Sequence, residues 1–360
     1  MSTLKVDGIR SNSASSDAIT LASDGTCTAN ITNNLSNRNL IINGSMIVAQ
    51  RGTSTAANGI ETVDRYNMNC SGYDEQPTQA QADVASGTTP YTLGFRKSYK
   101  ITNGNQTSGA GAADRLRILY VVEAQDIANS GWNYTDSNSK LTLSFWVKSS
   151  VAQNFYFRAT SSDGTSYNYP METGSLSADT WTKITKTIPG NSNLAFNNDN
   201  GVGLYIIFAI FRGTDNTNNA TSLNTWTITS SAQYLYPDNT STWWTTNDAT
   251  WEVTGLQLEV DHTGSGVATS FEHRSYADEL RRCQRYYYRN SGVLYLCAYG
   301  SNAINNMFHP VEMRANPTVS ETTSSGNLTS ISQITKLSCY YYKASSDGAA
   351  GTGIQAEAEL

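Results

Sequence analysis

The sequence predicts an all-β protein: an antiparallel β-sandwich preceded by a short extended segment and followed by one short helix and a small carboxyl-terminal β domain. The first observation behind this prediction is composition, because only 15% of the 360 residues are charged and 21 are tyrosine. Threonine and aromatic side chains favour strands. The second is a series of strand-like segments between residues 39 and 261, separated by polar loops and with no convincing helix among them.

Charge and hydropathy argue against two classes of partner. The chain has 24 lysines and arginines against 30 acidic residues, a net charge of −6. Because nucleic-acid binding needs cations that neutralise phosphates, we expect no nucleic-acid partner. The longest apolar run, residues 204–211, is much shorter than the roughly twenty residues that span a membrane. We therefore expect no membrane insertion, and this run predicts a strand buried on both faces.

Residues 1–37 are rich in serine, asparagine, glycine and aspartate and contain only short alternating apolar pieces. A segment with so few apolar side chains cannot form a core alone. One interpretation is a flexible tail. The other is a trimerisation segment, in which three chains cover one another through Leu4, Val6 and Ile9.

Residues 38–274 form the predicted sandwich. The stretch LTLSFWV alternates, which places Leu141, Leu143, Phe145 and Val147 on one face of a strand. Only residues 123–130 have the character of a helical turn. A length of 360 residues exceeds a comfortable single core, so we expect two or more domains.

The one good helix is predicted over residues 275–290. Ser275 precedes Asp278 at the spacing of a capping box. A single apolar stripe at i, i+4, i+7 and i+11 consists of Tyr276, Leu280, Cys283 and Tyr287. We assign Leu280, Cys283 and Tyr287 to a trimer interface, and we expect the arginines of this helix to bond carboxylates or carbonyls of a neighbouring subunit rather than nucleic acid. Residues 291–360 return to β character as a small tip domain.

Several segments carry a resemblance. LKVDGIRS…DAITLASDGT resembles the short repeat that opens many bacteriophage tail-fibre and virion appendage proteins. NLIINGSMIVAQRG…TVDRY and WEVTGLQLEV…FEHRSYADELRRCQRYYYR resemble the first strand, and the last strand with its exit helix, of jelly-roll modules in phage minor structural proteins. The final IQAEAEL is similar to the end of phage fibre tips.

The resemblance implies a jelly-roll sandwich similar to carbohydrate-binding modules, within a structural, homotrimeric protein of the virion. We expect a short tail fibre on the exposed part of the particle. Residues 1–37 would attach to other virion proteins, and residues 291–360 would meet host cell-surface polysaccharide. Two alternatives stay open: a capsid decoration or whisker protein without a receptor role, and a secreted polysaccharide-binding or polysaccharide-cleaving protein.

The sequence offers little for catalysis. The three histidines, His262, His273 and His309, stand in no nucleophile or zinc motif, and we expect His273 to bond the helix start or pack at the domain junction. Two carboxylate pairs suit glycoside hydrolysis, Glu61 with Asp64 and Glu252 with Glu259. Glu252 and Glu259 differ by seven residues, which places them on opposite faces of a continuous strand. We therefore expect a non-enzyme.

Metal sites have weak support in the sequence. The five cysteines are widely spread and include no C-x-x-C pair, so we expect neither a disulfide framework nor a thiolate metal site. The jelly-roll resemblance leaves a structural calcium ion open, although no ordered loop of acids is present. We expect no other cofactor.

Glycan binding is the most plausible chemistry, because proteins hold sugars by stacking aromatic rings on them and by amide and hydroxyl hydrogen bonds. Three loops contain both aromatic rings and amide or hydroxyl groups. Their candidate residues are Trp132, Tyr134, Tyr167, Tyr169, Trp243 and Trp244. For the Trp243–Trp244 pair, a core or intersubunit plug is the alternative interpretation.

Overall fold

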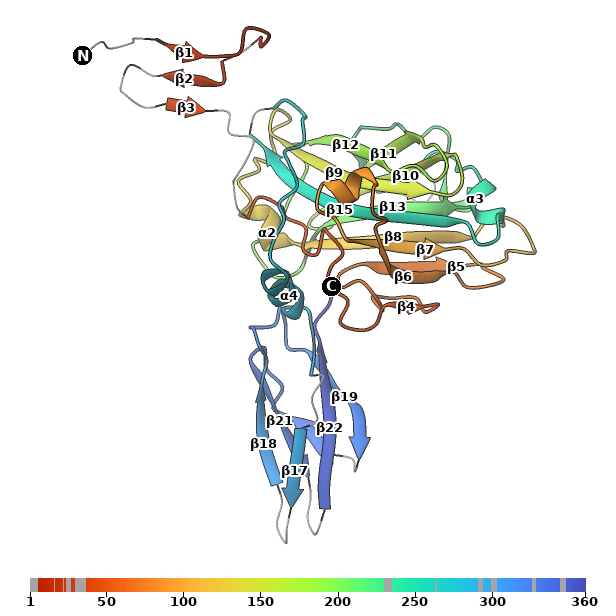
Figure 1. The fold of residues 1–360 in the computed structure, drawn as a ribbon, viewed down its shortest axis with the longest axis vertical. Helices are drawn as coiled ribbons and strands as arrows, with labels where there is room; N and C mark the ends of the chain where they lie inside the picture. The colour runs from red at the N-terminus through yellow and green to blue at the C-terminus, as the bar shows by residue number, and fades with distance from the viewer. Residues whose placement is uncertain are drawn as a thin grey trace.

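The chain folds into an amino-terminal arm, a large sandwich and a smaller lower β unit, with helix α4 between the last two (Figure 1). This computed structural model describes residues 6–360 apart from 16, 22, 24–26, 30–36, 230–234, 263, 291–293, 299–302, 326–327 and 344–347. The predicted all-β sandwich is confirmed. Among the described helices, none has the length and apolar character needed to cross a membrane.

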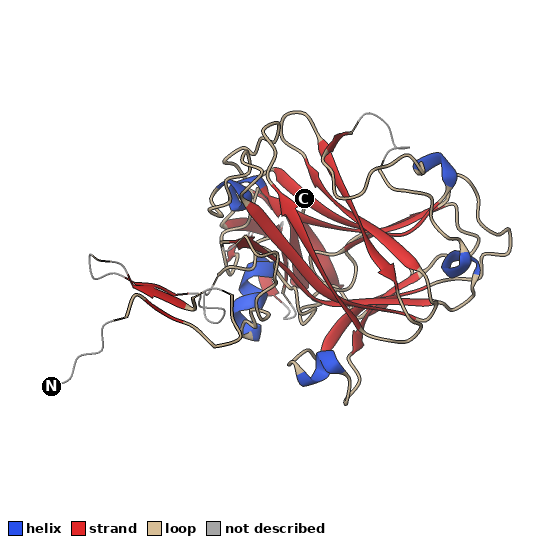
Figure 2. Cartoon of the chain, turned by 90° about the horizontal axis from the view of Figure 1, so that it is seen from above, coloured by secondary structure: helices blue, strands red, loops and turns tan. Residues whose placement is uncertain are grey.

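The amino-terminal arm is a small antiparallel sheet that stands clear of the sandwich in both views (Figures 1 and 2). Its strands are β1 (Gly8–Ile9), β2 (Ile19–Leu21) and β3 (Cys27–Ala29). Val6 and Ile9 are 37% and 53% exposed. Their role in a trimer interface stays a prediction, and Leu4 lies outside the described residues.

The sandwich consists of two six-stranded antiparallel sheets. The first, called the β8 sheet, has the order β14-β11-β10-β13-β8-β5, with β14 (Thr227–Ile228), β11 (Tyr167–Ser175), β10 (Asn154–Ser161), β13 (Val202–Arg212), β8 (Arg115–Glu123) and β5 (Asn67–Ser71). The second, called the β9 sheet, has the order β12-β9-β15-β7-β6-β4, with β12 (Thr182–Pro189), β9 (Lys140–Ser149), β15 (Thr250–Asp261), β7 (Lys97–Thr102), β6 (Thr78–Asp83) and β4 (Ser54–Thr55).

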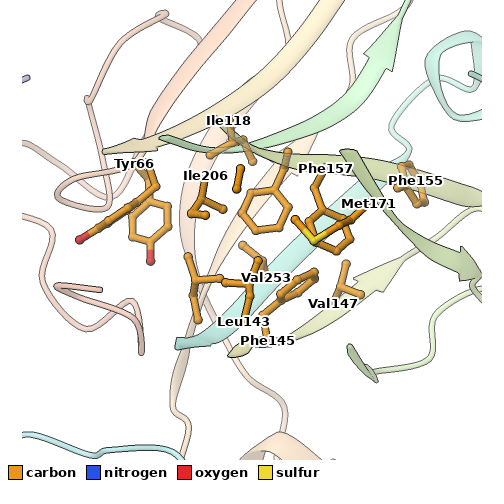
Figure 3. Packing of buried hydrophobic residues seen from close by; sticks show 14 of the residues in the cluster. Tyr66, Ile118, Leu143, Phe145, Val147, Phe155, Phe157, Met171, Ile206 and Val253 are labelled. Atoms are coloured by element: carbon orange, nitrogen blue, oxygen red, sulfur yellow. The ribbon is translucent and has the colours of Figure 1, made fainter. Parts of the chain in front are cut away.

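The sandwich core lies between these two sheets (Figure 3). The alternating face predicted for β9 is confirmed, since Leu141, Leu143, Phe145 and Val147 are all fully buried. The Phe145 ring meets the rings of Phe157 on β10 and Phe208 on β13, each edge-on with a centroid separation of 5.1 Å. Burying a side chain of this size contributes about 1.5–3 kcal/mol, so the facing aromatics hold the two sheets together.

Strand β13 is buried on both faces, as its continuous apolar run predicts. Ile206 and Phe208 face the core, and the outward Ile207 and Ala209 are only 3% and 1% exposed. Leu235 packs with Ala209 on this outer surface. Leu235 and Tyr236, which lie between β14 and α3, therefore cover part of the outer face of the β8 sheet.

Two β-bulges change which side chains face outward. In β15 the pairing with β9 shifts between Thr254 and Gln257, where Gly255 has a φ of +65°. The bulge places Glu252 and Glu259 on the same outer face, so the prediction that they point to opposite faces is wrong. In β13 the shift between Ala209 and Phe211 turns Phe211 into the core.

The short helices of the sandwich lie at loops. They are α1 (Thr89–Thr92), α2 (Ala124–Ala128), the 3₁₀ turn η1 (Thr214–Asn216) and α3 (Thr242–Thr245). Helix α2 corresponds to the helical turn predicted at residues 123–130. Helix α3 was not predicted.

Helix α4 (Tyr276–Gln284) leads out of the sandwich. The Ser275 hydroxyl accepts a hydrogen bond from the backbone N–H of Asp278 at 3.2 Å, as the capping pattern predicts. The helix ends before the predicted residue 290, because β16 (Tyr287–Arg289) pairs with β22 (Gly348–Glu357).

Two of the residues assigned to a trimer interface on this segment are buried within their own chain. Cys283 is 1% exposed and Tyr287 is 2% exposed. They cannot also face a neighbouring subunit, so that assignment is wrong for both. Leu280 is half-buried and Tyr276 is 58% exposed, which leaves part of the predicted stripe accessible.

The lower β unit contains two small sheets. In the first, β22 pairs with β16, β17 (Leu294–Ala298) and β19 (Thr318–Ser325). In the second, β21 (Ser338–Lys343) lies between β18 (Ala303–Phe308) and β20 (Ser330–Ser332). Its main apolar cluster is Met307, Leu328, Cys339, Tyr341 and Ile354.

The junction between the sandwich and the lower β unit is built from buried charges. Arg65, which lies just before strand β5, forms an ion pair with Glu359. Its Cζ atom lies 3.4 Å from the centroid of the Tyr286 ring. Burial opposes the charge of Arg65, but Glu359 raises its pKa above the ordinary value. Glu123 is fully buried and accepts two 2.9 Å hydrogen bonds from Arg285 and one of 2.5 Å from Tyr286.

The FEHRSY segment, residues 271–276, has a structural role beside this junction. Glu272 accepts hydrogen bonds from the backbone N–H groups of Asn37 and Asn39, at 2.6 and 2.8 Å. Arg274 donates to the carbonyls of Asn39 and Ile41. The motif therefore bonds residues 37–41, where the sandwich begins, to the segment that leaves the sandwich after β15.

Candidate functional site

Four of the six predicted glycan-binding aromatics are buried. Trp132 and Tyr169 are 3% and 4% exposed, and Trp243 and Trp244 are fully buried. A ring must have one open face to stack on a sugar. The structure therefore contradicts the prediction for these four residues and assigns them to packing.

Trp243 and Trp244 are both buried because α3 is a helix turn, in which strand alternation does not apply. The indole N–H of Trp243 donates to the carbonyl of Thr250 at 3.0 Å. The Trp244 ring stacks on Phe211 with centroids 5.1 Å apart and an interplanar angle of 16°. These contacts match the core alternative for the tryptophan pair.

The other two predicted residues, Tyr134 and Tyr167, are half-buried at the edge of the core. Tyr134 meets Phe196 edge-on at 5.0 Å. Tyr167 begins β11 and pairs with Ile228. Tyr134 lies in the loop before β9, whereas Tyr167 is a strand residue, so the structure does not join them in one site.

The predicted carboxylate pairs are occupied by other partners. Glu252 is 2.9 Å from the Lys148 amine, and Glu259 is 3.1 Å from the Arg38 guanidinium. Their cross-strand partners on β9, Lys148 and Thr142, are six residues apart. This separates Glu252 and Glu259 by roughly 20 Å along the sheet, whereas glycosidase pairs lie about 5–10 Å apart.

The two carboxylates of the other predicted pair, Glu61 and Asp64, lie in different environments. Asp64 is 1% exposed, and burial raises its pKa to about 6 although Gln50 donates to it. Glu61, three residues earlier, is exposed. Asp64 supports the junction, because Gln50 also donates to the carbonyl of Tyr287 at 2.8 Å.

Metal ligands do not converge in the part of the chain that the structure describes. No group of three or more histidine, cysteine or acidic side chains there could hold an ion. Cys70, Cys283 and Cys339 are buried free thiols. His273 stands two residues before the N-cap Ser275, and its Nε2–H donates to the carbonyl of Leu93 at 2.9 Å rather than to the helix.

An apolar cleft of about 340 Å³ lies on the outer face of the β9 sheet. Its walls include Trp146 on β9, Lys183 on β12, and Phe271 and His273 from the segment after β15. Trp146 and Phe271 are half-buried, so each keeps part of its surface accessible. We call this the Trp146 cleft.

The cleft has a rigid aromatic wall. The rings of Phe95, Phe271 and His273 are mutually 4.9–5.0 Å apart. Phe95 is 2% exposed, and a side chain on Gly255 would come within 2.7 Å of its ring. The β15 bulge therefore makes room for the wall.

Trp146 is not among the residues predicted to bind glycans, although the sequence of β9 contains a signal for it. In β9 the inward residues are Phe145 and Val147, so Trp146 between them must point outward. It pairs with Lys183 across the sheet. An outward tryptophan beside an amine and the Ser144 hydroxyl can stack on the apolar face of a sugar and bond its hydroxyls.

Two larger clefts surround the base of the arm and α4. One, of about 790 Å³, is lined by Arg38, Arg274, Asp278, Arg281 and Arg282 among others. The second, of about 500 Å³, shares Asn37, Arg38 and Arg282. The larger cleft shares Phe271 and His273 with the Trp146 cleft, but neither of the two has a tryptophan in its wall.

No family model and no curated protein matches this chain. Remote similarity exists to solved structures. A putative sugar-binding protein from Bacteroides thetaiotaomicron is 10% identical with a TM-score of 0.34, and the match covers 62% of this chain and 100% of that one. A family 11 carbohydrate-binding module of Clostridium thermocellum is 14% identical with a TM-score of 0.28, covering 58% and 95%.

A third similar structure is the enzymatically active domain of tailspike protein 4 from bacteriophage CBA120. It is 8% identical with a TM-score of 0.33, and the match covers 62% of this chain. This chain spans only 22% of that tailspike structure. Similarity at this level says nothing about what this chain binds.

Proposed function

We propose that this chain is a non-enzymatic structural protein of a phage particle, a short trimeric tail fibre that binds host cell-surface glycans. The observation that supports glycan binding is the Trp146 cleft, which the half-buried indole of Trp146 and the half-buried ring of Phe271 both line. The cleft size of about 340 Å³ suits one or two sugar rings. Lys183 and Ser144 supply polar partners at its edge.

Replacing Trp146 with alanine should weaken polysaccharide binding about tenfold or more, the equivalent of at least 1.4 kcal/mol, because the stacking surface is lost. Affinity electrophoresis through gels containing host surface polysaccharide measures the change. Trp181→Ala is the matched control, since Trp181 is a half-buried tryptophan near Lys148 outside the cleft. Equal retardation of Trp146→Ala and the parent chain would contradict the glycan site.

Exposed apolar side chains support the trimer. Val6 and Ile9 on the arm, and Ile304 and Phe308 on β18, are 37%, 53%, 66% and 71% exposed. Ile304 and Phe308 lie four residues apart, hence on one face of the strand. Neighbouring chains would bury these residues, and the arm would remain at one end for attachment to other virion proteins.

Sedimentation of the full chain should give a trimer at micromolar concentration. Removal of residues 1–37 should shift the population toward monomer. The arm has no core of its own, and its loss removes the apolar side chains of Val6 and Ile9 that neighbouring chains would bury. A full chain that stays monomeric at this concentration would end the trimer proposal. Immunogold labelling of virions then distinguishes a tail fibre from a head decoration protein.

A further inference from the structure

The outer face of the β8 sheet carries four arginines. Arg115 and Arg117 flank the buried Leu116 on β8, and Arg158 follows the buried Phe157 on β10. The bulge in β13 turns Phe211 inward, and the next residue, Arg212, pairs with Arg115. We call these four residues the arginine face.

The arginine face has neutral partners only. Arg117 donates to Asn69 at 3.2 Å, Arg158 to Asn168 at 2.5 Å, and Arg212 to Asn216 at 3.1 Å. Among the described residues none of the four arginines forms an ion pair, and the Nε atoms of Arg115, Arg158 and Arg212 have no hydrogen-bond partner. Arg158 and Arg212 are only 5% and 3% exposed.

The carboxylates of the adjoining segments bond elsewhere. Asp114 accepts from the backbone N–H of Gly111 at 2.6 Å. Glu172 accepts from Asn154 at 2.8 Å, and Asp238 accepts from the Thr217 hydroxyl at 2.6 Å.

The four charges repel one another. Burial, together with the charges of Arg117, Arg158 and Arg115, lowers the pKa of Arg212 to about 10, although Tyr236 opposes this shift. Burial and the neighbouring Arg115 also lower the pKa of Arg117. Holding such a group without a counter-charge costs free energy. A chain with a net charge of −6 nevertheless concentrates positive charge here.

The arrangement also defines where an anion can approach. The fully buried Tyr236 packs beside two guanidinium groups on this outer face, with the Cζ atoms of Arg158 and Arg212 at 5.3 and 5.7 Å from its ring centroid. Arg115 and Arg117 are half-buried. Arg115 and Arg117 can therefore contact a ligand directly, while the charges of the buried Arg158 and Arg212 strengthen the positive field at the same face.

We propose that the arginine face binds the oxyanion groups, carboxylate or sulfate, of an acidic polysaccharide. Guanidinium groups bind such oxyanions with paired, charge-assisted hydrogen bonds. Nucleic acid is disfavoured, because its binding needs many cations along the phosphate backbone and this face has four arginines. The anion site stands apart from the Trp146 cleft on the opposite sheet; only the saccharide nature of its ligand rests on the proposed function.

The test uses the full chain with polygalacturonate as carboxylate probe, a sulfated dextran as sulfate probe, and neutral dextran as reference. The Arg115→Gln/Arg117→Gln double variant should lose at least tenfold in affinity for one acidic polymer. Arg281→Gln/Arg96→Gln, which removes two exposed arginines elsewhere, should keep it. Trp146→Ala should also keep it, which separates failure of this site from failure of the proposed function.

Thermal unfolding supplies a second readout. At low salt the Arg115→Gln/Arg117→Gln variant should be at least as stable as the parent, because repulsion is relieved, and sodium sulfate should raise Tm more in the parent. The proposal is overturned if neither acidic polymer binds, if both double variants lose affinity equally, or if duplex DNA binds as tightly as the polysaccharide.

Discussion

Replacement of Glu359 by glutamine is expected to lower the free energy of unfolding, or of undocking the lower β unit, by about 3–5 kcal/mol, the usual cost of leaving a buried charge unpaired. Arg65 has a side chain only 2% exposed, and Glu359 is its ion-pair partner. The remaining contacts of Arg65 are the carbonyl of Val121 at 2.8 Å and the ring of Tyr286. Neither group carries a compensating negative charge at neutral pH.

The control is Glu357→Gln, two residues before Glu359 and the last residue of β22. Glu357 is 50% exposed and 3.6 Å from Arg51, and surface pairs of this kind contribute at most about 1 kcal/mol. Urea unfolding followed by tryptophan fluorescence, with limited proteolysis of the lower β unit, measures both variants. Equal, small losses would show that Arg65 does not depend on Glu359.

The Trp244→Ala variant is expected to lose about 3–5 kcal/mol of stability, as large aromatic truncations in cores do. Trp244 is fully buried, stacks on Phe211, and donates to the carbonyl of Gly109 at 3.2 Å. Trp244→Phe should recover part of the loss, because it retains a stacking ring and loses the indole N–H.

Polysaccharide binding by the folded fraction of Trp244→Ala should be unchanged, since this ring has no open face. Denaturant midpoints and affinity electrophoresis below the unfolding transition separate the two effects. A stable Trp244→Ala protein with weakened glycan binding would restore Trp244 as a binding residue and contradict its assignment to the core.

The sandwich was predictable because strand alternation reports burial directly. Phe145 and Val147 were placed on the core face from their spacing alone, and the same reasoning applied to Trp146 would have found the aromatic cleft. Alternation fails where one residue is inserted. The Gly255 bulge and the shift before Phe211 depend on cross-strand register, which spacing within one strand cannot reveal.

The functional residues were harder to predict, because aromatic composition does not separate rings that pack from rings that bind. Trp243 and Trp244 lie in a helix turn whose burial comes from distant partners such as Phe211 and Thr250. The end of α4 was misplaced for a similar reason. Tyr287 continues the helical stripe in sequence, but pairing with Glu357 in β22 makes it a strand residue.

The junction has a consequence for how this protein can change. The lower β unit leaves the sandwich at Tyr286 and returns beside it, because the backbone N–H of Ala358 donates to the carbonyl of Tyr286 at 2.7 Å. Residues 290–353 thus form an insertion whose two ends are joined next to each other, at Tyr286 and Ala358. Recombination could exchange residues 290–353 for a segment of different length while Arg65, Glu123 and Arg285 kept the same docking base, so the unit beyond the junction could change without redesign of the sandwich.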